Sequence, residues 1–220
     1  MIGEWQGEPV VAEARAYRGT GVAFARIATV EAAALSIGNL LVIPDATSSA
    51  PLFGADLVWV GTRPQMAMIA CDLSPTLDDC GARAAQNGAT AAAIAAAIAA
   101  ASPSAATVPS GGALPAWCEA VFSPSSLYTR FGAKDADGVG EAFDGYLEAF
   151  LALARRSAAH AGSRKRMAPI GNSRGIFNYC LRHREEDRGL LLLERLFGKM
   201  RARRYLDHVL FPISIDGCAT

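Results

Sequence analysis

Residues 35–60 read LSIGNLLVIPDATSSAPLFGADLVWV, and this stretch decides the fold. Two apolar runs rich in β-branched residues, 33–43 and 52–60, are separated by Pro44 and a polar turn over residues 45–49. Such runs, bounded by Pro, Gly, Asp and Ser, are typical of β-strands. Because a parallel pair needs a crossover of about a dozen residues or more, this short connection predicts an antiparallel pair.

The same pattern continues on both sides of this stretch. Residues 10–17, 21–30 and 66–73 are predicted to be strands, with turns at Gly19 and at 61–64. Short connections between them predict an antiparallel meander. Since no GxGxxG or GxxxxGKS motif opens a helix, the sequence excludes the common phosphate-binding α/β folds.

After Pro75 the pattern becomes helical. The predicted elements are a helix over 76–101, a Pro/Ser/Gly linker over 102–112, a strand over 121–131, and helices over 140–161, 173–184, 189–197 and 200–210. Strands first and helices afterwards predict an α+β fold, in which helices pack on the faces of a sheet. We expect residues 1–220 to form a single domain.

Composition limits the class of protein. The chain has 220 residues, of which 51% are hydrophobic and 19% charged, enough apolar content for a core and too much for intrinsic disorder. Its 21 basic and 21 acidic residues balance, so net charge does not favour nucleic acid or an anionic membrane. The first residues lack the features of a signal peptide. We expect a cytoplasmic monomer that binds neither nucleic acid nor membrane.

The charges are unevenly distributed along the chain. Residues 1–150 hold 7 Lys and Arg against 15 Asp and Glu, whereas residues 151–220 hold 14 against 6. The C-terminal third is therefore predicted to form a basic surface, suited to an anionic ligand or an acidic partner protein. A solvated face that only balances the acidic part of the chain is the alternative.

Cysteine and histidine patterns indicate neither a disulfide framework nor a metal site. The five cysteines are widely spaced without a CxxC pair, and the three histidines form no HxH or HxxxH pair. Any chemistry is expected to come from carboxylates, hydroxyls and amides.

Three polar residues interrupt predicted strands at positions where apolar residues are expected: Asn39, Asp56 and Asp72. Burial disfavours the charged form of a carboxyl and raises its pKa, which would make Asp56 a proton donor near neutral pH. The alternative for Asp56 is an outward position on a solvated face of the sheet. Asp72, just before Leu-Ser-Pro, is interpreted as a turn cap.

Several short blocks together resemble one family. They are GNLLVIP at 38–44, PLFGADLV at 51–58, IACDLSP at 69–75 and FSPSSLYTR at 122–130, followed by NY at 178–179, DRG at 187–189, LFG at 196–198, RYL at 204–206 and VLFP at 209–212. In this order they resemble the ferredoxin-dependent bilin reductases, and especially the phycoerythrobilin and phytochromobilin synthase branches.

The resemblance implies a three-layer α/β/α sandwich with a central antiparallel sheet, which holds an open-chain tetrapyrrole between the sheet and the C-terminal helices. It implies no bound metal or flavin. Single electrons would come from a reduced [2Fe-2S] ferredoxin, and biliverdin or a dihydrobiliverdin would be reduced through radical intermediates. Heme oxygenase or a bilin-accepting photoreceptor is a further candidate partner.

The resemblance also implies roles for individual residues. Asp56 falls on the central aspartate that donates a proton from the sheet, and Asp187 on an aspartate that acts from the opposite side. Arg188 falls where a basic residue contacts a propionate. Asn39 falls on a catalytic position where the phycocyanobilin synthases have His and the other branches have Asn.

Two departures bear on the product. A glutamate of the phycocyanobilin branch, twelve residues before Asn39, would fall at Ile27, and the segment before the first predicted strand is short. Both departures point away from phycocyanobilin as the product, because the vinyl reduction that depends on the glutamate is not expected here. Asn39 and the Phe-Ser-Pro block together favour reduction at the A-ring vinyl system, which gives a phytobilin chromophore. Reduction of the 15,16 methine bridge to 15,16-dihydrobiliverdin, the chlorophyll-catabolite branch of the same superfamily and a non-catalytic tetrapyrrole-binding protein are the alternatives.

Overall fold

The centre of the molecule is an antiparallel sheet. The computed structural model describes residues 1–220 except 6, 46–47, 62–65, 77–82, 161–173 and 213–220. Within this part, each strand pairs with the next one along the chain, which confirms the predicted meander. The strands are β1 (Ile2–Trp5), β2 (Glu8–Gly19), β3 (Val22–Ala32), β4 (Leu35–Pro44), β5 (Leu52–Val60), β6 (Met66–Ser74) and β7 (Leu127–Phe131).

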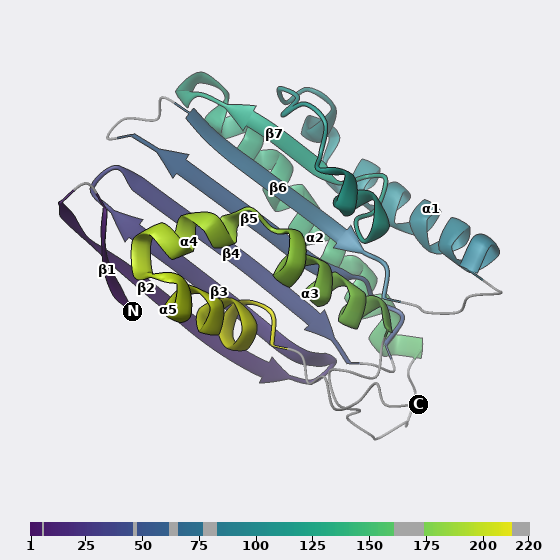
Figure 1. Ribbon diagram of the computed structural model, residues 1–220. Helices are drawn as coiled ribbons and strands as arrows, with labels where there is room; N and C mark the ends of the chain where they lie inside the picture. The colour runs from purple at the N-terminus through teal and green to yellow at the C-terminus, as the bar shows by residue number, and fades with distance from the viewer. Residues whose placement is uncertain (6, 46–47, 62–65, 77–82, 161–173, 213–220) are drawn as a thin grey trace.

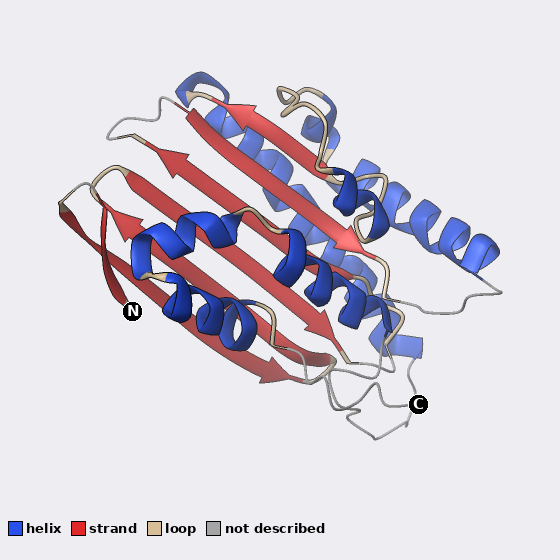
Figure 2. Cartoon of the chain, viewed as in Figure 1, coloured by secondary structure: helices blue, strands red, loops and turns tan. Residues whose placement is uncertain are grey.

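Helices lie on both faces of the sheet (Figures 1 and 2). In the view of Figure 1, α1 (Arg83–Ala101) and α2 (Ala136–His160) lie behind it. In front lie α3 (Arg174–Glu186), α4 (Gly189–Phe197) and α5 (Lys199–Tyr205), and a π-helical turn, Leu206–Leu210, continues α5. The α+β class predicted from the sequence is confirmed by this arrangement.

The two faces carry separate hydrophobic cores. Apolar side chains of β2, β3 and β4, such as Val30 and Leu41, pack in front against α3, α4 and α5. Those of β5, β6 and β7, such as Phe53 and Ile69, pack behind against α1 and α2. Because side chains alternate between the faces of a strand, each strand contributes to both layers. The front of β5 and β6 is therefore left for the pocket described below.

The strand predicted over 121–131 is wrong in its first half. Residues 116–120 form a short 3-10 helix, and β7 begins only at Leu127. Between them, the Ser126 amide donates to the Ser123 carbonyl at 3.2 Å in a tight turn that contains Pro124. Proline cannot donate a ladder hydrogen bond, so this segment turns instead of pairing.

Other boundaries differ less. Strand β1 was not predicted. Helix α2 begins at Ala136, four residues before the expected start at residue 140. The expected linker contains a 3-10 helix, Pro103–Ala106. The last predicted helix ends as the π-helical turn. The helix start expected at residue 76 adjoins a stretch outside the described residues, and the helix start expected at residue 173 lies within such a stretch. Cys80, Cys218 and the basic residues 164–166 also lie outside the described residues.

Three cysteines that the structure describes, Cys71, Cys118 and Cys180, are buried free thiols. None of the helices in the described part of the chain combines the length and apolarity that a membrane crossing requires.

The packing of α2 against the end of α1 depends on a glycine. A Cβ at Gly145 would lie 2.6 Å from the Ala101 carbonyl oxygen and closer still to the Ser102 side chain. In the same helix, a Cβ at the exposed Gly140 would meet no atom within 4 Å.

These two glycines give a matched test of the packing. We expect Gly145→Ala to lower the free energy of unfolding by about 1–3 kcal/mol, because the added methyl overpacks the contact. Gly140→Ala should raise it by about 0.5–1 kcal/mol, because alanine favours the helix. Urea unfolding measures both changes, and equal effects of the two substitutions would contradict this packing.

Candidate active site

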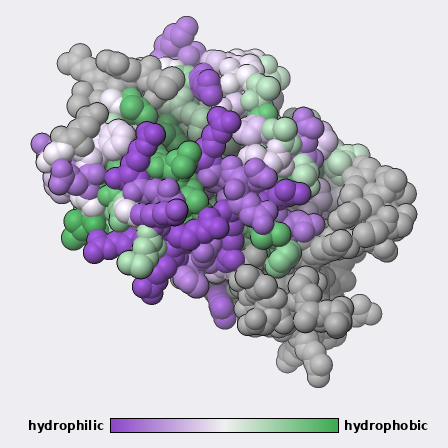
Figure 3. All heavy atoms as spheres, viewed as in Figure 1, coloured by the Kyte–Doolittle hydropathy of each residue, from purple (hydrophilic) through white to green (hydrophobic). Residues whose placement is uncertain are grey.

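A cavity of about 480 Å³ lies on the front of the sheet, between the strands and the C-terminal helices. Its size falls within the range of roughly 300–1,000 Å³ that small-molecule sites occupy. Its walls are mostly apolar, and the face seen in Figure 3 shows hydrophobic residues between hydrophilic ones. The lining comes from β3–β7, residues 113–122, α3–α5 and the turn that follows α5.

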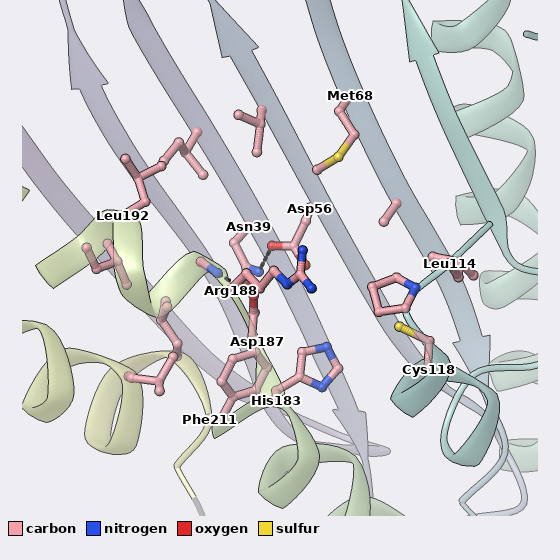
Figure 4. Close-up of a pocket in the computed structure, with 18 of the residues that line it drawn as sticks. Asn39, Asp56, Met68, Leu114, Cys118, His183, Asp187, Arg188, Leu192 and Phe211 are labelled. Carbon is pink, nitrogen blue, oxygen red and sulfur yellow. Dashed lines mark hydrogen bonds between the residues drawn. The ribbon is translucent and has the colours of Figure 1, made fainter. Parts of the chain in front are cut away.

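The strand register brings Asn39 and Asp56 together on the floor of this cavity. Asn39 of β4 pairs directly with Asp56 of β5, and its other neighbour across the sheet is Ala28 of β3. Directly opposed residues of an antiparallel pair point to the same face. Two of the predicted site residues therefore lie side by side, as Figure 4 shows.

A chain of hydrogen bonds crosses three strands at this point. The Asn39 side-chain NH2 donates to Oδ1 of Asp56, and the Asn39 Oδ1 accepts from the guanidinium of Arg26. Arg26 also donates to the Asn39 backbone carbonyl at 3.5 Å. Arg26 is only 1% exposed, so a cation is held inside the front core beside the cavity floor.

The surroundings raise the pKa of Asp56 to about 7, from an ordinary 3.8. Burial is the largest cause, and the Asp187 carboxylate adds to it, whereas the Asn39 hydrogen bond and the Arg26 charge act in the opposite direction. A carboxyl of this kind holds a proton near neutral pH and can release it to a bound molecule.

Asp187 and Arg188 enter the cavity lining from the turn between α3 and α4. Oδ1 of Asp187 accepts the Gly189 amide hydrogen at 2.7 Å, so this carboxylate also caps the start of α4. Arg188 is exposed next to it. The four residues predicted for the site, Asn39, Asp56, Asp187 and Arg188, are thus brought to one cavity.

His183 forms another part of the wall, surrounded by aromatic rings. Its ring centroid lies 4.2 Å from that of Tyr179, 4.6 Å from Phe211 and 4.8 Å from Trp117. Its Nδ1 lies 2.9 Å from the Tyr179 carbonyl. Burial lowers the pKa of His183, although Asp187 acts against this shift. A neutral imidazole that donates from Nδ1 leaves Nε2 as an acceptor.

The turn-cap interpretation of Asp72 is wrong. Asp72 is 1% exposed and lies within β6, where its carboxylate accepts the Ser123 amide at 3.0 Å, the Ser123 hydroxyl at 2.6 Å and the Ser74 hydroxyl. Burial raises its pKa to about 6, against the effect of these donors. Asp72 fixes the segment that carries Trp117 and Phe122 to the sheet.

The inference drawn from Ile27 is also corrected. Ile27 pairs with Leu40, which packs against the rear core, and it is 51% exposed on that side of the sheet. It does not line the cavity. The front-facing neighbours of this position are Arg26 and Ala28, because side chains alternate along a strand. Ile27 therefore does not distinguish between the products that the resemblance implies.

Arg26 and His183 were missed from the sequence. Arg26 lies on the same face of its strand as Phe24, Ala28 and Val30, which are buried. A charged residue at such an inward position is uncommon, so the sequence pattern could have indicated a special role for Arg26. His183 follows Tyr179 by one helical turn, but a histidine on an apolar helix face has no specific meaning by itself. In the described part of the chain no group of His, Cys, Asp and Glu side chains could hold a metal ion.

Comparisons with known proteins agree on one family. Residues 1–212 match the family model described as ferredoxin-dependent bilin reductase. The phycoerythrobilin:ferredoxin oxidoreductase of Prochlorococcus marinus strain MIT 9211 is 29% identical over 205 residues, covering 90% of this chain and 75% of that protein. Its counterpart in Synechococcus sp. strain RCC307 is 30% identical over 195 residues, covering 86% and 70%.

A solved structure shares the fold. The crystal structure of phytochromobilin synthase from tomato in complex with biliverdin matches with a TM-score of 0.69. The match covers 96% of this chain and 72% of the tomato protein, at 18% sequence identity.

The raised pKa of Asp56 predicts a pH-dependent stability. The folded protein keeps a proton that the unfolded chain releases, so this carboxyl lowers the free energy of unfolding as the pH rises from about 4 to about 7. We expect Asp56→Asn to be more stable than the wild type at pH 8 by an amount on the order of 4 kcal/mol, and about equally stable near pH 4. Urea unfolding at both pH values measures this difference in the free energy of unfolding. A difference that does not change with pH would mean that Asp56 is solvated and has an ordinary pKa.

Proposed function

The chain belongs to the ferredoxin-dependent bilin reductase family, and we propose that it reduces biliverdin or a dihydrobiliverdin with electrons from a reduced [2Fe-2S] ferredoxin. The observation that carries the proposal is Asp56, a carboxyl whose pKa is about 7 on the floor of an apolar cavity. Reduction of a conjugated tetrapyrrole adds both electrons and protons. Ferredoxin supplies the electrons but not the protons. A side chain that holds a proton at neutral pH supplies what is missing.

We assign the site residues as follows. Asp56 donates a proton to the bilin from the sheet side, and Asn39 holds the carboxyl in place through its NH2 group. Asp187 faces the same cavity from the helical side and is a second candidate donor. Arg188 pairs with a propionate at the cavity rim, where its exposed guanidinium can form a charge-assisted hydrogen bond. We propose that residues 1–220 form a single domain.

Two carboxyls on opposite walls support reduction at the A-ring vinyl system, giving a phytobilin chromophore. Reduction of the 15,16 methine bridge to 15,16-dihydrobiliverdin uses the same residue types and is the closest alternative. The experiment is anaerobic incubation with biliverdin or 15,16-dihydrobiliverdin, reduced ferredoxin and ferredoxin reductase, followed by chromatography of the products. A-ring products support the proposal, 15,16-dihydrobiliverdin as the end product supports the alternative, and binding without turnover indicates a carrier.

Asparagine variants separate the two carboxyls. We expect Asp56→Asn to bind bilin with unchanged affinity and to lose turnover, with a long-lived radical signal in EPR, because the amide keeps the shape but has no proton to give. Asp187→Asn should change the rate or the product. Asparagine also caps helices well, so the start of α4 should be retained. If Asp56→Asn turns over at the wild-type rate, the role of Asp56 is structural and not catalytic. If Asp187→Asn has the wild-type rate and product, Asp187 only caps the start of α4.

The basic residues of α5 offer a docking surface for an acidic ferredoxin. Hydrophilic residues cover much of the face that carries α3–α5 (Figure 3), and Arg201 and Arg204 are exposed there. Arg203 is already engaged, since it donates to the Arg184 carbonyl at 3.1 Å and lies 3.5 Å from the Asp207 carboxylate. Arg201 and Arg204 can therefore be changed with less risk to the fold.

Charge reversal tests this surface. We expect Arg201→Glu with Arg204→Glu to raise the ferredoxin concentration for half-maximal rate, because charge complementarity accelerates association. Added salt should weaken the wild type in the same way, since screening at physiological salt acts over roughly 8 Å. Bilin affinity should not change. The control is Arg15→Glu with Arg155→Glu, which makes the same change in net charge behind the sheet; an equal effect there would exclude α5 as the docking surface.

A further inference from the structure

Arg26 occupies an unusual position for an arginine. It lies in β3 with 1% of its surface exposed, and its Nε is buried without a hydrogen-bond partner. Burial lowers its pKa to about 10, so it remains a cation at neutral pH. A buried donor left unsatisfied costs free energy, and an apolar side chain would fill the same space without that cost. Packing alone therefore does not explain why an arginine stands here.

Its hydrogen bonds constrain a single side chain, that of Asn39. An asparagine amide presents either its oxygen or its NH2 group to a given neighbour, and only rotation of the amide exchanges them. Arg26 has donors only, so the Asn39 Oδ1 must face it. The NH2 group then faces Asp56, as observed. Reversing the amide would bring its NH2 against a guanidinium and its oxygen against a carboxylate oxygen.

We propose that Arg26 is a positioning residue that locks the Asn39 amide with its NH2 group toward Asp56, so that Oδ1 of Asp56 is engaged and Oδ2 is the oxygen that carries the proton. The role of that proton in bilin reduction rests on the proposed function. The positioning itself is a property of the ligand-free protein.

The groups around Asp56 define what else could shift its titration. They are Arg26 from β3, Cys71 from β6, Tyr179 from α3 and Asp187 from the turn after α3. His183 of α3 and Arg188 of the turn after it line the same cavity. Around Arg26 itself, α3 contributes Tyr179 and Cys180, and α5 contributes Tyr205. Among these groups, Arg26 is the cation that favours the ionised form of Asp56.

Removing Arg26 acts on Asp56 in two ways with the same sign. The attraction of the cation for the carboxylate is lost, which raises the pKa of Asp56. The Asn39 amide also becomes free to rotate, and its oxygen can then accept a hydrogen bond from the protonated carboxyl. Both effects favour the protonated form.

The test is a pH titration of Asp carboxyl carbons by NMR in ligand-free protein labelled with ¹³C at aspartate, with Asp56 assigned from the Asp56→Asn spectrum. We expect Arg26→Met to move the Asp56 midpoint upward by about one pH unit, the lower end of the effect of a nearby opposite charge. Arg26→Lys keeps the charge and a donor and should stay close to the wild type. Arg15→Met, which removes an exposed arginine from the rear of β2, is the control and should change nothing.

An Asp56 midpoint that is the same in Arg26→Met and the wild type would overturn the proposal. If Arg26→Met does not fold, the test is made on the wild type. The chemical shifts of the Asn39 side-chain NH2 group should then change with pH at the same midpoint as the Asp56 carboxyl. NH2 shifts that do not change at this midpoint would overturn the proposal. Failure of the wild type to reduce bilins would remove the proposed function and leave this titration unaffected. Where turnover is observed, Arg26→Met should lower kcat and leave KM for the bilin nearly unchanged.

Discussion

The site depends on the hydrogen bond between the Asn39 amide and the Asp56 carboxyl, which joins β4 and β5 across the front of the sheet. A carboxyl in an apolar cavity is costly to ionise and costly to leave without partners. The amide gives it one firm partner, and the Asp187 carboxylate and burial keep it near the point of protonation at neutral pH. The hydrogen bond therefore holds Asp56 in place, whereas burial and the Asp187 carboxylate prepare it for proton transfer.

The two-sided fold makes room for this interaction. Helices α1 and α2 cover β5, β6 and β7 from behind, so β5, the strand that carries Asp56, is packed from the far side. Helices α3, α4 and α5 cover mainly β2, β3 and β4 in front. Asp72 fixes residues 116–123 to β6, so aromatic residues close the cavity on its remaining side. Walls fixed by packing and hydrogen bonds reduce the reorganisation that proton transfer would otherwise need.

The sequence predicted the meander well, because short turns between alternating strands allow little else, and it brought attention to Asn39 and Asp56 as polar residues at inward positions. It failed where tertiary contacts decide. The turn at Pro124 follows Ser123, which the Asp72 carboxylate holds from 51 residues earlier in the chain. The interpretation of Ile27 needed the strand register, because a shift of one residue turns a side chain to the other face of the sheet. Arg26 could have been noticed as a charge at an inward position, but its partner on the next strand could not.

Infrared difference spectroscopy of the bilin-loaded protein tests the central claim most directly, because it follows the Asp56 proton itself. One electron is delivered under anaerobic conditions to protein labelled with ¹³C at aspartate, with Asp56→Asn as the reference. The account predicts that a protonated carboxyl band disappears as the bilin is reduced, that a carboxylate band replaces it, and that Asp56→Asn shows neither change. A carboxyl band that persists in the wild type while the bilin is reduced would contradict the account.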